Sequence, residues 1–330
     1  MGVCPFCLLV TAASLGGKTV RTRAARRSRV LMAGIGVAIA VTVLGCSADA
    51  PAPSVQTMPT APAKPWVKVW SDSFNGPAGQ SLNSSTWKFD TGQGTFGTGE
   101  IERNTASTSN VRLDGHGDLQ IVPLRNGSSW TSARIQTRNT NFGAPAGGEM
   151  MVTASIKQPD AANLTGYWPA FWLVGPGKWP ETGEIDILED VDSATHDSGT
   201  LHCGNLIQKN PDGTTGPCHE GAGLGSGLRP CPSCGTSYQS YAVVVDRRNA
   251  ADEQIRWYHN GQEYFSVNES RVGTTAWTQG VDHGYHIIFD LAIGGVFPNL
   301  DCHCQSPTGQ TTPGAAMSVA SLALYYLEPS

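Results

Sequence analysis

Short apolar segments with alternating polarity recur along the chain from residue 67 onward. Six of them are rich in β-branched and aromatic residues and are bounded by Gly, Pro, Asn or Asp: 67–74, 117–124, 149–157, 240–246, 285–293 and 317–326. No segment of comparable length carries apolar residues at the 3.6-residue spacing of an amphipathic helix. The pattern therefore predicts an all-β chain built from short strands.

A tight hairpin can be placed near residue 260. The dipeptide Asn260-Gly261 separates two strand-like runs within 255–267, and both residue types tolerate the positive φ angles that a two-residue hairpin turn needs. We find no repeat of fixed period, so a propeller is disfavoured. A single core within about 265 residues predicts a β-jelly-roll sandwich of two large antiparallel sheets.

The most unusual segment is acidic. Residues 179–192, WPETGEIDILEDVD, hold six carboxylates in fourteen positions of a chain that is only 15% charged. In a regular strand the side chains of Glu184 and Asp186 share one face, but Glu189 falls on the opposite one. In one interpretation the strand is regular and the acids are merely solvated. In the other, one extra residue forms a β-bulge that turns Glu189 back to the face of Glu184.

The bulged arrangement would have a clear chemical meaning. Two Glu side chains that lean toward each other can reach the carboxyl separation of roughly 5–5.5 Å that retaining glycosidases use. Asp186, between Glu184 and Glu189, can hydrogen-bond to one of them and raise the proton affinity of the other by like-charge repulsion. The three acids would then comprise an ionised nucleophile and a protonated acid.

Aromatic residues precede the acidic segment. Trp168, Trp172 and Trp179 lie within twelve residues, and Phe171 lies among them. Because Trp168 and Trp172 differ by an even number, both lie on one strand face, whereas Phe171 belongs to the core. Tryptophans beside paired carboxylates are suited to stacking on sugar rings. The alternative is that all of these aromatics are core residues.

The first 46 residues differ from the rest of the chain. They contain six basic residues and no acidic one, followed by an apolar run at 30–45 that is shorter than the roughly 20 residues of a comfortable membrane span. We interpret residues 1–46 as an export signal. The ending at Cys46 resembles the lipobox of bacterial lipoproteins, in which this cysteine is lipidated; the alternative is ordinary signal cleavage near Ala48 or Ala50.

Residues 47–65 are almost entirely Ala, Pro, Ser and Thr and are interpreted as an extended tether, so residues 66–330 form one domain. Without the leader's six cations, 16 of the 22 basic residues remain against 27 acidic ones, a net charge of −11. This charge argues against nucleic acid or an anionic membrane as a partner. We expect an exported monomer that acts on a neutral polymer, either secreted or held at the cell envelope by a lipid on Cys46.

Six cysteines lie outside the leader: Cys203, Cys218, Cys231, Cys234, Cys302 and Cys304. An even number in an exported chain favours three disulfides, for which fifteen pairings exist, and we expect them to fasten the turn-rich loop 202–237. The alternative is a zinc site that uses the Cys231-x-x-Cys234 spacing together with Cys302, His303 and Cys304.

The segments WPAFWLVG and WPETGEIDILE resemble the signature of glycoside hydrolase family 16, in the bulged E-x-D-x-x-E form of laminarinase-like β-1,3-glucanases. Further resemblance runs in order along the chain: WSDSFNG at 70–76, GTGEIERNT at 97–105, SARIQTR at 132–138, GTLHCG at 199–204 and FDLAIGG at 289–295. The resemblance implies a jelly roll with a substrate cleft along its concave sheet and a retaining double displacement.

Matched position by position, the resemblance implies that Glu184 is the nucleophile, Glu189 the general acid/base and Asp186 the assisting carboxylate. It implies sugar stacking by Trp172 and Trp179, with Trp168 a weaker candidate. His202 matches a residue near the leaving group; without the resemblance it would be a packed or disulfide-adjacent histidine. Arg134 matches a residue that reaches substrate hydroxyls, although a lone Arg is more often solvated. With His202 and Arg134, the predicted substrate-binding residues number five.

Four positions depart from the family pattern. Gln239 and Val245 stand where a His and a Trp are frequent, so leaving-side contacts are expected to differ. Asp290 replaces a common Asn. Ala320 stands where many relatives have an Asp that helps to hold a structural calcium ion, so we doubt that ion here. We expect no metal or other cofactor in the chemistry.

Three functions are therefore weighed. The first is an endo-acting glucanase that hydrolyses β-1,3 or mixed β-1,3/1,4 linkages. The second is a transglycosylase or a hydrolase of another polysaccharide, which the same three acids would serve. The third is a non-catalytic glycan-binding lipoprotein, which the presence of both Glu184 and Glu189 disfavours.

Overall fold

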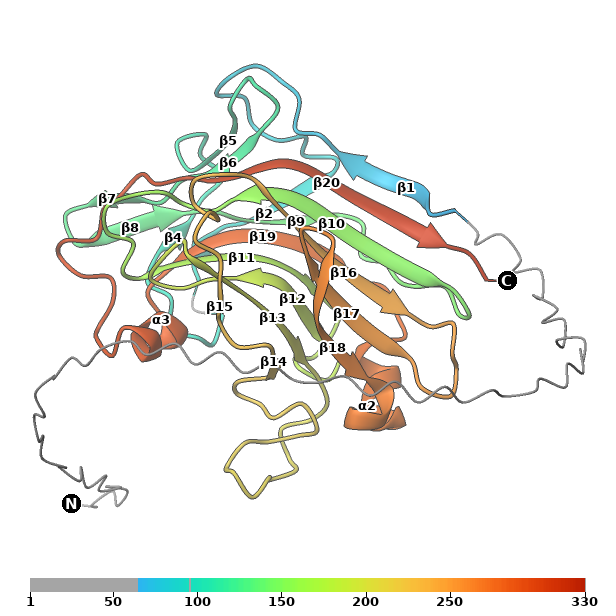
Figure 1. Cartoon of the computed structure of the whole chain (residues 1–330). Coiled ribbons are helices and arrows are strands. Elements are labelled where there is room, and N and C mark those ends of the chain that lie inside the picture. Colours follow the sequence, from blue (N-terminus) through green and yellow to red (C-terminus); the bar gives the residue numbers. More distant parts are fainter. Residues whose placement is uncertain (1–64, 95, 330) are drawn as a thin grey trace, which may run out of the picture. The chain divides into compact units, whose positions relative to one another are not determined.

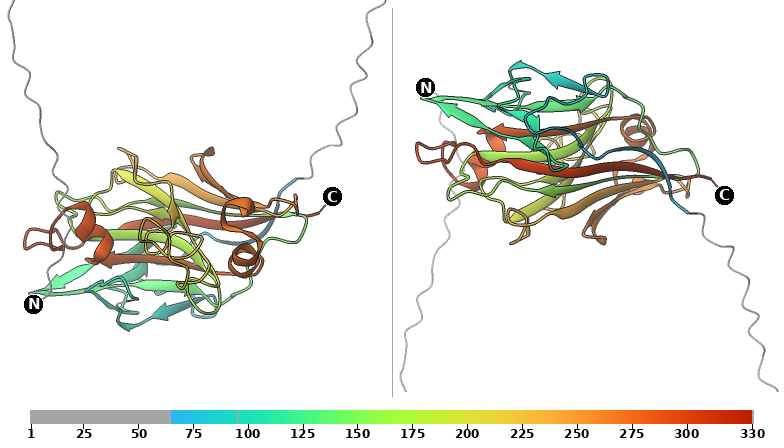
Figure 2. Two further views of the ribbon diagram at one scale, coloured as in Figure 1. Left: turned by 90° about the horizontal axis from the view of Figure 1, so that it is seen from below. Right: turned by 90° about the horizontal axis from the view of Figure 1, so that it is seen from above.

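Two antiparallel sheets of eight strands each make up most of the fold of residues 65–94 and 96–329, the part that this computed structural model describes (Figure 1). The two sheets form packed layers, which Figure 2 shows from below and from above. Short turns join many of the strands, and within these described residues three brief helices interrupt them. The predicted all-β sandwich of two large sheets is confirmed.

The first sheet contains, in spatial order, β18 (Gln262–Asn268), β17 (Gln254–His259), β16 (Gln239–Asp246), β10 (Glu149–Lys157), β20 (Met317–Leu327), β6 (Leu119–Ile121) and β5 (Val111–Leu113), and β1 (Val67–Asp72) also pairs with β20. The long strands β10 and β20 form its centre. Their inward-facing residues are apolar, because each strand alternates between the core and the outer surface.

The second sheet contains β14 (Leu224–Gly225), β13 (His196–His202), β12 (Glu184–Glu189), β11 (Tyr167–Val174), β19 (His286–Ile293), β9 (Arg134–Thr137) and β2 (Trp87–Asp90), and β15 (Arg229–Pro230) also pairs with β13. A small third sheet contains β3 (Gly92–Gln93), β4 (Arg103–Asn104), β8 (Ser129–Ser132) and β7 (Leu124–Asn126). The second sheet carries the acidic segment at its centre, on β12.

The helices are α1 (Glu269–Val272), α2 (Thr274–Gly280) and α3 (Val296–Asp301). None of them is a long amphipathic helix, as the sequence pattern predicts. Within the described residues, the structure contains no helix with the length and apolar character of a membrane span.

The core lies between the two large sheets. Trp87, Phe171, Trp257 and Phe289 are among its largest fully buried side chains. Phe171 stacks on Phe289 with ring centroids 4.7 Å apart, which confirms that Phe171 is a core residue. Burying such side chains contributes roughly 1.5–3 kcal/mol for an aromatic of phenylalanine size. The core therefore fixes which face of each strand points outward.

Five of the six predicted strands match the structure, and the segment at 67–74 is a strand as far as Asp72, in β1. The segments at 149–157, 240–246, 285–293 and 317–326 lie in β10, β16, β19 and β20. The segment at 117–124 is divided, because Pro123 cannot donate a hydrogen bond to a sheet and separates β6 from β7.

The predicted hairpin is also confirmed. β17 and β18 are joined at Asn260 and Gly261, whose φ angles of 49° and 76° are both positive. A two-residue turn of this kind matches the twist of the strands that it joins.

All six described cysteines form disulfides: Cys203–Cys218, Cys231–Cys234 and Cys302–Cys304. The first two lie within the loop region 202–237, as predicted, and the third lies after α3. The zinc interpretation of these cysteines is wrong, because each sulfur is bonded to another sulfur. The predicted export signal, the predicted lipobox and nearly all of the predicted tether at 47–65 lie outside the described residues.

Candidate active site

The three acids of β12 lie on the outer face of the second sheet, on the far side from the core. On the neighbouring strand β13 only Gly199 faces the two residues Ile187 and Leu188, so β12 contains one extra residue at this point. Ile187 and Leu188 are both buried in the core. The predicted bulge is therefore present, and it returns Glu189 to the face of Glu184.

A tryptophan from the opposite sheet braces the bulge. Trp257 on β17 donates its indole N–H to the backbone carbonyl of Asp186 at 2.7 Å. A bulge disrupts the ladder of the strand, and a buried carbonyl without a partner would cost about 1–3 kcal/mol. Gly199 leaves space for the Trp257 ring, because a Cβ atom at residue 199 would lie only 2.4 Å from Trp257 Cδ1. The two sheets are thus joined at the point where the acids are positioned.

His202, at the end of β13, lies against two of the acids. Its Nε2 is 3.5 Å from Asp186 Oδ2 and 3.9 Å from Glu184 Oε1. On the other side of the ring, Nδ1 is hydrogen-bonded to Glu220 Oε2 at 2.6 Å. The other Glu220 oxygen accepts the backbone N–H of Cys203 at 3.0 Å. Glu220 is almost fully buried and holds the imidazole in one orientation.

Burial and mutual repulsion raise the proton affinity of the acids. Burial raises the pKa of Glu184 to about 7, with His202 opposing and Glu189 adding to the rise. Burial, and then the charges of Glu189 and Glu184, raise the pKa of Asp186 well above its usual range. The pKa of Glu189 is raised by burial and lowered in part by the Trp168 hydrogen bond.

His202 is cationic at neutral pH. Burial acts against its protonation, but the hydrogen bond to Glu220 and the charges of Glu184, Glu220 and Glu189 outweigh burial and raise the pKa of His202 to about 9. Because its imidazolium lies nearer to Glu184 and Asp186 than to any other acid of the strand, a negative charge on Glu184 is favoured. The imidazolium thus favours the charged form of Glu184, while burial raises the pKa values of Asp186 and Glu189 above their usual ranges.

The two tryptophans of β11 lie on the outer face, as predicted from their spacing. Trp168 donates its indole N–H to Glu189 Oε1 at 2.9 Å, and its ring meets Phe297 edge to face. Trp172 donates to Asp290 Oδ1 at 2.7 Å. Trp172 packs in a small apolar group separate from the main core. Both indoles therefore belong to the same face as the acids.

Trp179 lies in the loop that precedes β12. It is 43% exposed, and its ring centroid lies 5.7 Å from that of His202. A tryptophan this exposed beside buried acids leaves an apolar ring face available to a ligand.

Arg134 lies on β9 and is held by three neighbours. Its guanidinium lies over the rings of Phe96 and Trp172, 3.9 and 4.6 Å from their centroids, and its Nε donates to Asp90 Oδ2 at 3.2 Å. Arg134 also lines a cavity of about 650 Å³ together with Asp90 and Phe96. Arg134 is thus a fixed part of the face rather than a freely solvated residue.

The departures from the family pattern fall in two different places. Gln239 and Val245 lie on β16 in the first sheet, where Val245 is fully buried in the core and Gln239 bonds to Ser233 and Asn260. The expectation that they alter contacts in the cleft is wrong, because the core separates them from the acids. Asp290, in contrast, accepts the hydrogen bond of Trp172 within the site.

Sequence reasoning did not identify Glu220 or Trp257 as part of the site. Glu220 follows Cys218 in the turn-rich loop, and nothing in its local pattern distinguishes it from a solvated acid. Trp257 lies within a strand whose alternation predicts only that it faces the core. The contacts of both depend on which distant strands are neighbours.

The arrangement is suited to acid–base and nucleophilic chemistry on an uncharged ligand. Two glutamates flank an aspartate on one face, an imidazolium neutralises part of their charge, and indole rings surround them. The pairing of an ionised carboxylate with a protonated one is the requirement for glycosidic bond cleavage. The predicted carboxyl separation of Glu184 and Glu189 stays a prediction.

Comparison with known proteins identifies a family of enzymes. A family profile described as the XgeA-like catalytic GH16 domain matches residues 119–223. The crystal structure of an endo-1,3-beta-glucanase from Streptomyces sioyaensis has a TM-score of 0.74 and 39% sequence identity, and the match covers 82% of this chain and 100% of that one.

Two curated relatives agree with this result. A beta-glucanase of Rhodothermus marinus is 26% identical over 253 residues, which cover 70% of this chain and 77% of the relative. The clotting factor G alpha subunit of Tachypleus tridentatus is 28% identical over 249 residues, 72% of this chain, but the chain spans only 31% of that longer protein. The similarity thus extends over most of the described domain.

Proposed function

The chain belongs to glycoside hydrolase family 16, and on this premise we propose that it is an exported, retaining endo-hydrolase of β-1,3-linked glucans. The observation that carries the proposal is the bulge in β12, which places Glu184, Asp186 and Glu189 on one outward face. The 39% identity to the crystallised chain of an endo-1,3-beta-glucanase, all of which the match covers, supports the linkage. A mixed β-1,3/1,4-glucan is the alternative substrate.

The first chemical step forms a covalent intermediate. Glu184, ionised beside the His202 imidazolium, attacks the anomeric carbon of the glucosyl unit, while Glu189 gives its proton to the departing glycosidic oxygen. The bond between the anomeric carbon and that oxygen breaks, and a Glu184 ester forms. Trp168 donates a hydrogen bond to Glu189 and stabilises the carboxylate that remains.

The second step reverses the roles. Glu189, now ionised, removes a proton from water, and the resulting oxygen attacks the anomeric carbon and releases Glu184 as a carboxylate. Asp186 holds a proton between the two glutamates and limits the negative charge in the cluster, as the high pKa of Asp186 supports. Both steps use only side chains and water, so we propose no cofactor.

The substrate lies along the outer face of the second sheet. Trp179 provides an exposed ring face for a glucosyl unit near the acids, and Arg134, which lies over the buried ring of Trp172, contacts sugar hydroxyls from β9. A neutral glucan suits this site, because an anionic polymer would be repelled by the remaining carboxylate charge.

Export is part of the proposal. Three disulfides in the described residues are typical of oxidising compartments outside the cytosol. The basic and apolar segment 1–46 supports an export signal. Cys46 supports attachment to the cell envelope through a lipid, and the alternative is full secretion.

The decisive experiment assigns the two glutamates separately. On laminarin, Glu189→Gln is expected to lower kcat by about 10²–10⁴-fold, and Glu184→Gln by at least as much. On a dinitrophenyl β-glycoside of a β-1,3-linked oligosaccharide, whose leaving group needs no protonation, Glu189→Gln should release a burst of dinitrophenolate and Glu184→Gln should not. Glu181→Gln, which changes a partly exposed partner of Lys178, is the matched control and should behave as the wild type.

Three outcomes would contradict the proposal. Wild-type protein that binds laminarin but releases no reducing ends would indicate a binding protein. A first product with inverted anomeric configuration in an NMR time course would exclude double displacement. Equal activity of Glu184→Gln and wild type would remove Glu184 from the reaction.

A further inference from the structure

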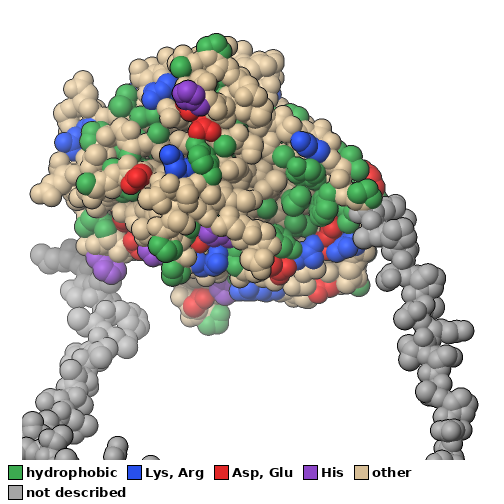
Figure 3. Space-filling view, turned by 45° about the horizontal axis from the view of Figure 1, so that its top comes forward, with side chains coloured by type: hydrophobic (Ala, Val, Ile, Leu, Met, Phe, Trp, Pro, Cys, Tyr) green, Lys and Arg blue, Asp and Glu red, His purple; other side chains and the backbone are tan. Residues whose placement is uncertain are grey.

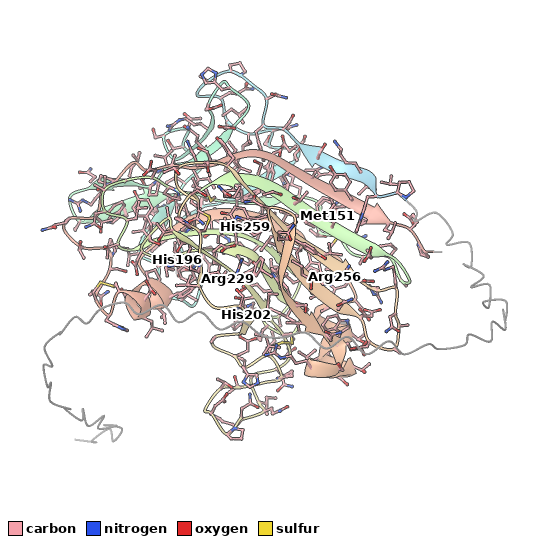
Figure 4. All side chains as sticks on the ribbon, in the orientation of Figure 1. Met151, His196, His202, Arg229, Arg256 and His259 are labelled. Atoms are coloured by element: carbon pink, nitrogen blue, oxygen red, sulfur yellow. A yellow bond between two sulfur atoms is a disulfide. The ribbon has the colours of Figure 1, made fainter. Side chains whose placement is uncertain are left out.

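Three potential metal ligands converge at the acid cluster. His202 Nε2, one oxygen of Glu184 and one oxygen of Asp186 all lie within 4.8 Å of one another. Two of the separations are 3.5 Å, from Nε2 to Asp186, and 3.9 Å, from Nε2 to Glu184. Figure 4 labels His202 near the lower edge of the sheet, above the long loop that contains Glu220.

The burial of Asp186 gives a second, independent indication. Its side chain is 4% exposed, and Oδ2 accepts no hydrogen bond from the described residues. This oxygen forms an ion pair with the His202 imidazolium, whose Nε2 is 3.5 Å away. A cation is thus already favoured at this buried oxygen, and a metal ion bound to neutral His202 would take the place of the imidazolium charge.

Glu220 completes an arrangement typical of metal-binding histidines. Such a histidine usually donates its second ring N–H to a carboxylate, which fixes the ring and increases the basicity of the ligating nitrogen. Here Nδ1 is bonded to Glu220 at 2.6 Å, and Glu220 is itself held by the backbone N–H of Cys203. Nε2 is consequently directed at the two acids.

We propose that Glu184, Asp186 and His202 form a binding site for a borderline divalent transition metal ion, Zn²⁺ or Cu²⁺, and that the bound ion inhibits the enzyme. The inhibition rests on the proposed function, because the ion would occupy the lone pairs with which Glu184 attacks the substrate. Metal binding itself does not depend on that function.

Two of the three separations between ligand atoms come close to what zinc requires. Ligands at about 2.0–2.1 Å in a tetrahedron are about 3.3 Å from one another. The contact from Nε2 to Asp186 is within a few tenths of an ångström of this value, and the contact to Glu184 requires a shift of about half an ångström. Water would fill the fourth position. Calcium fits poorly, because it requires six to eight oxygen ligands and seldom uses imidazole.

Binding exchanges two protons for the ion. Zn²⁺ takes the place of the proton on His202 Nε2 and of the proton that Asp186 holds, both protons leave for solvent, and the neutral imidazole keeps its Nδ1–H on Glu220. The ion then bonds to Nε2 and to the two carboxylates, and no oxidation or reduction occurs.

The second group of ligand-type side chains among the described residues contains Cys231, Cys234 and His259. Its two cysteines form a disulfide, so they offer no thiolate to a metal. The acid cluster is therefore the stronger site.

Calorimetric titration of the full chain with ZnCl₂ tests the binding. Wild type should bind one more equivalent of Zn²⁺ than His202→Asn. Any Zn²⁺ that binds to Cys4, Cys7 or Cys46 binds equally to both proteins and cancels in this comparison. Glu220→Gln should bind about 10–100-fold more weakly than wild type. His219→Gln, which removes an exposed histidine paired with Asp212, is the control and should match the wild type. CaCl₂ should give no binding at this site.

The activity measurement follows separately. Zn²⁺ should inhibit laminarin hydrolysis competitively, and a chelator should restore the full rate.

The metal site would be overturned if wild type and His202→Asn bound zinc with equal stoichiometry and affinity while near-ultraviolet circular dichroism showed both to be folded. Glu220→Gln, which leaves the three ligands in place, tests the same claim if His202→Asn does not fold. Binding without hydrolysis of any glucan would refute the proposed function but not the metal site.

Discussion

At the scale of single residues, one cation decides how charge is distributed among three acids. The imidazolium of His202 lies 3.5 Å from Asp186 and 3.9 Å from Glu184, and Glu220 keeps it protonated. Without this charge, burial alone would favour the neutral form of every carboxyl group. The function proposed for Glu184 therefore depends on a residue outside its own strand.

The pH dependence of kcat/KM should reveal this cation. Because burial raises the pKa of Glu184 from 4.5 to about 7, kcat/KM should fall as the pH decreases through about 7 and Glu184 gains a proton. His202 lowers the pKa of Glu184, so His202→Asn should move this acidic limb to higher pH. A limb that stays in place in His202→Asn would show that Glu184 and His202 are not coupled.

At the scale of elements, the loop between β13 and β14 brings Glu220 to the histidine. Figure 1 shows this loop in yellow, projecting away from both sheets. The Cys203–Cys218 disulfide closes it, and closure of a 15-residue segment restricts the unfolded chain by about 3 kcal/mol. The loop resembles an exposed appendage, yet it holds a buried carboxylate of the site.

We expect the double variant Cys203→Ala, Cys218→Ala to lose activity before it loses its fold. Glu220 would no longer be held against His202, so kcat should fall while the two large sheets keep their strand signal in circular dichroism. The control is Cys302→Ala, Cys304→Ala, which removes a disulfide of partly exposed cysteines after α3. If kcat falls equally in both double variants, the loop has no specific role in positioning Glu220.

At the scale of the whole molecule, the two sheets cooperate at the bulge. Trp257 belongs to the first sheet and bonds to Asp186 of the second, through the gap that Gly199 leaves in β13. A core residue of the first sheet, Trp257, therefore forms a hydrogen bond with the backbone of the strand that carries the acids.

Trp257→Phe should separate this contact from simple packing. Phenylalanine keeps an aromatic ring in the core but removes the N–H, which leaves the Asp186 carbonyl without its indole donor. We expect kcat to fall about tenfold with little change in KM, and the free energy of unfolding to fall by about 1–3 kcal/mol. Phe171→Leu, a core change that removes no side-chain hydrogen bond to β12, is the control for stability loss alone. Equal effects of both changes on kcat would contradict a positioning role.

The surface of the molecule also bears on its substrate. Figure 3 shows a face on which basic side chains occur singly or in small groups among acidic, apolar and neutral ones. This face offers no broad basic area for a polyanion, in agreement with the net charge that the sequence predicts.

Much of the fold and of the site could be predicted from local patterns. Alternation identified β10, β16, β19 and β20, and the turn at Asn260 identified one hairpin. The division of one predicted strand at Pro123 was missed, because alternation outweighed the single proline in that interpretation. Glu220 could not have been found, since its neighbours in sequence do not include any residue of the acid cluster.

The sequence by itself determined which residues could react and which side of each strand they could face, because side-chain alternation and turn chemistry are local properties. It could not decide between a regular and a bulged β12, since the spacing of Glu184, Asp186 and Glu189 is compatible with both. The tertiary structure decided this: Ile187 and Leu188 both find space in the core, and Trp257 satisfies the carbonyl of Asp186. The same burial sets the proton affinities of the acids, which no local pattern contains.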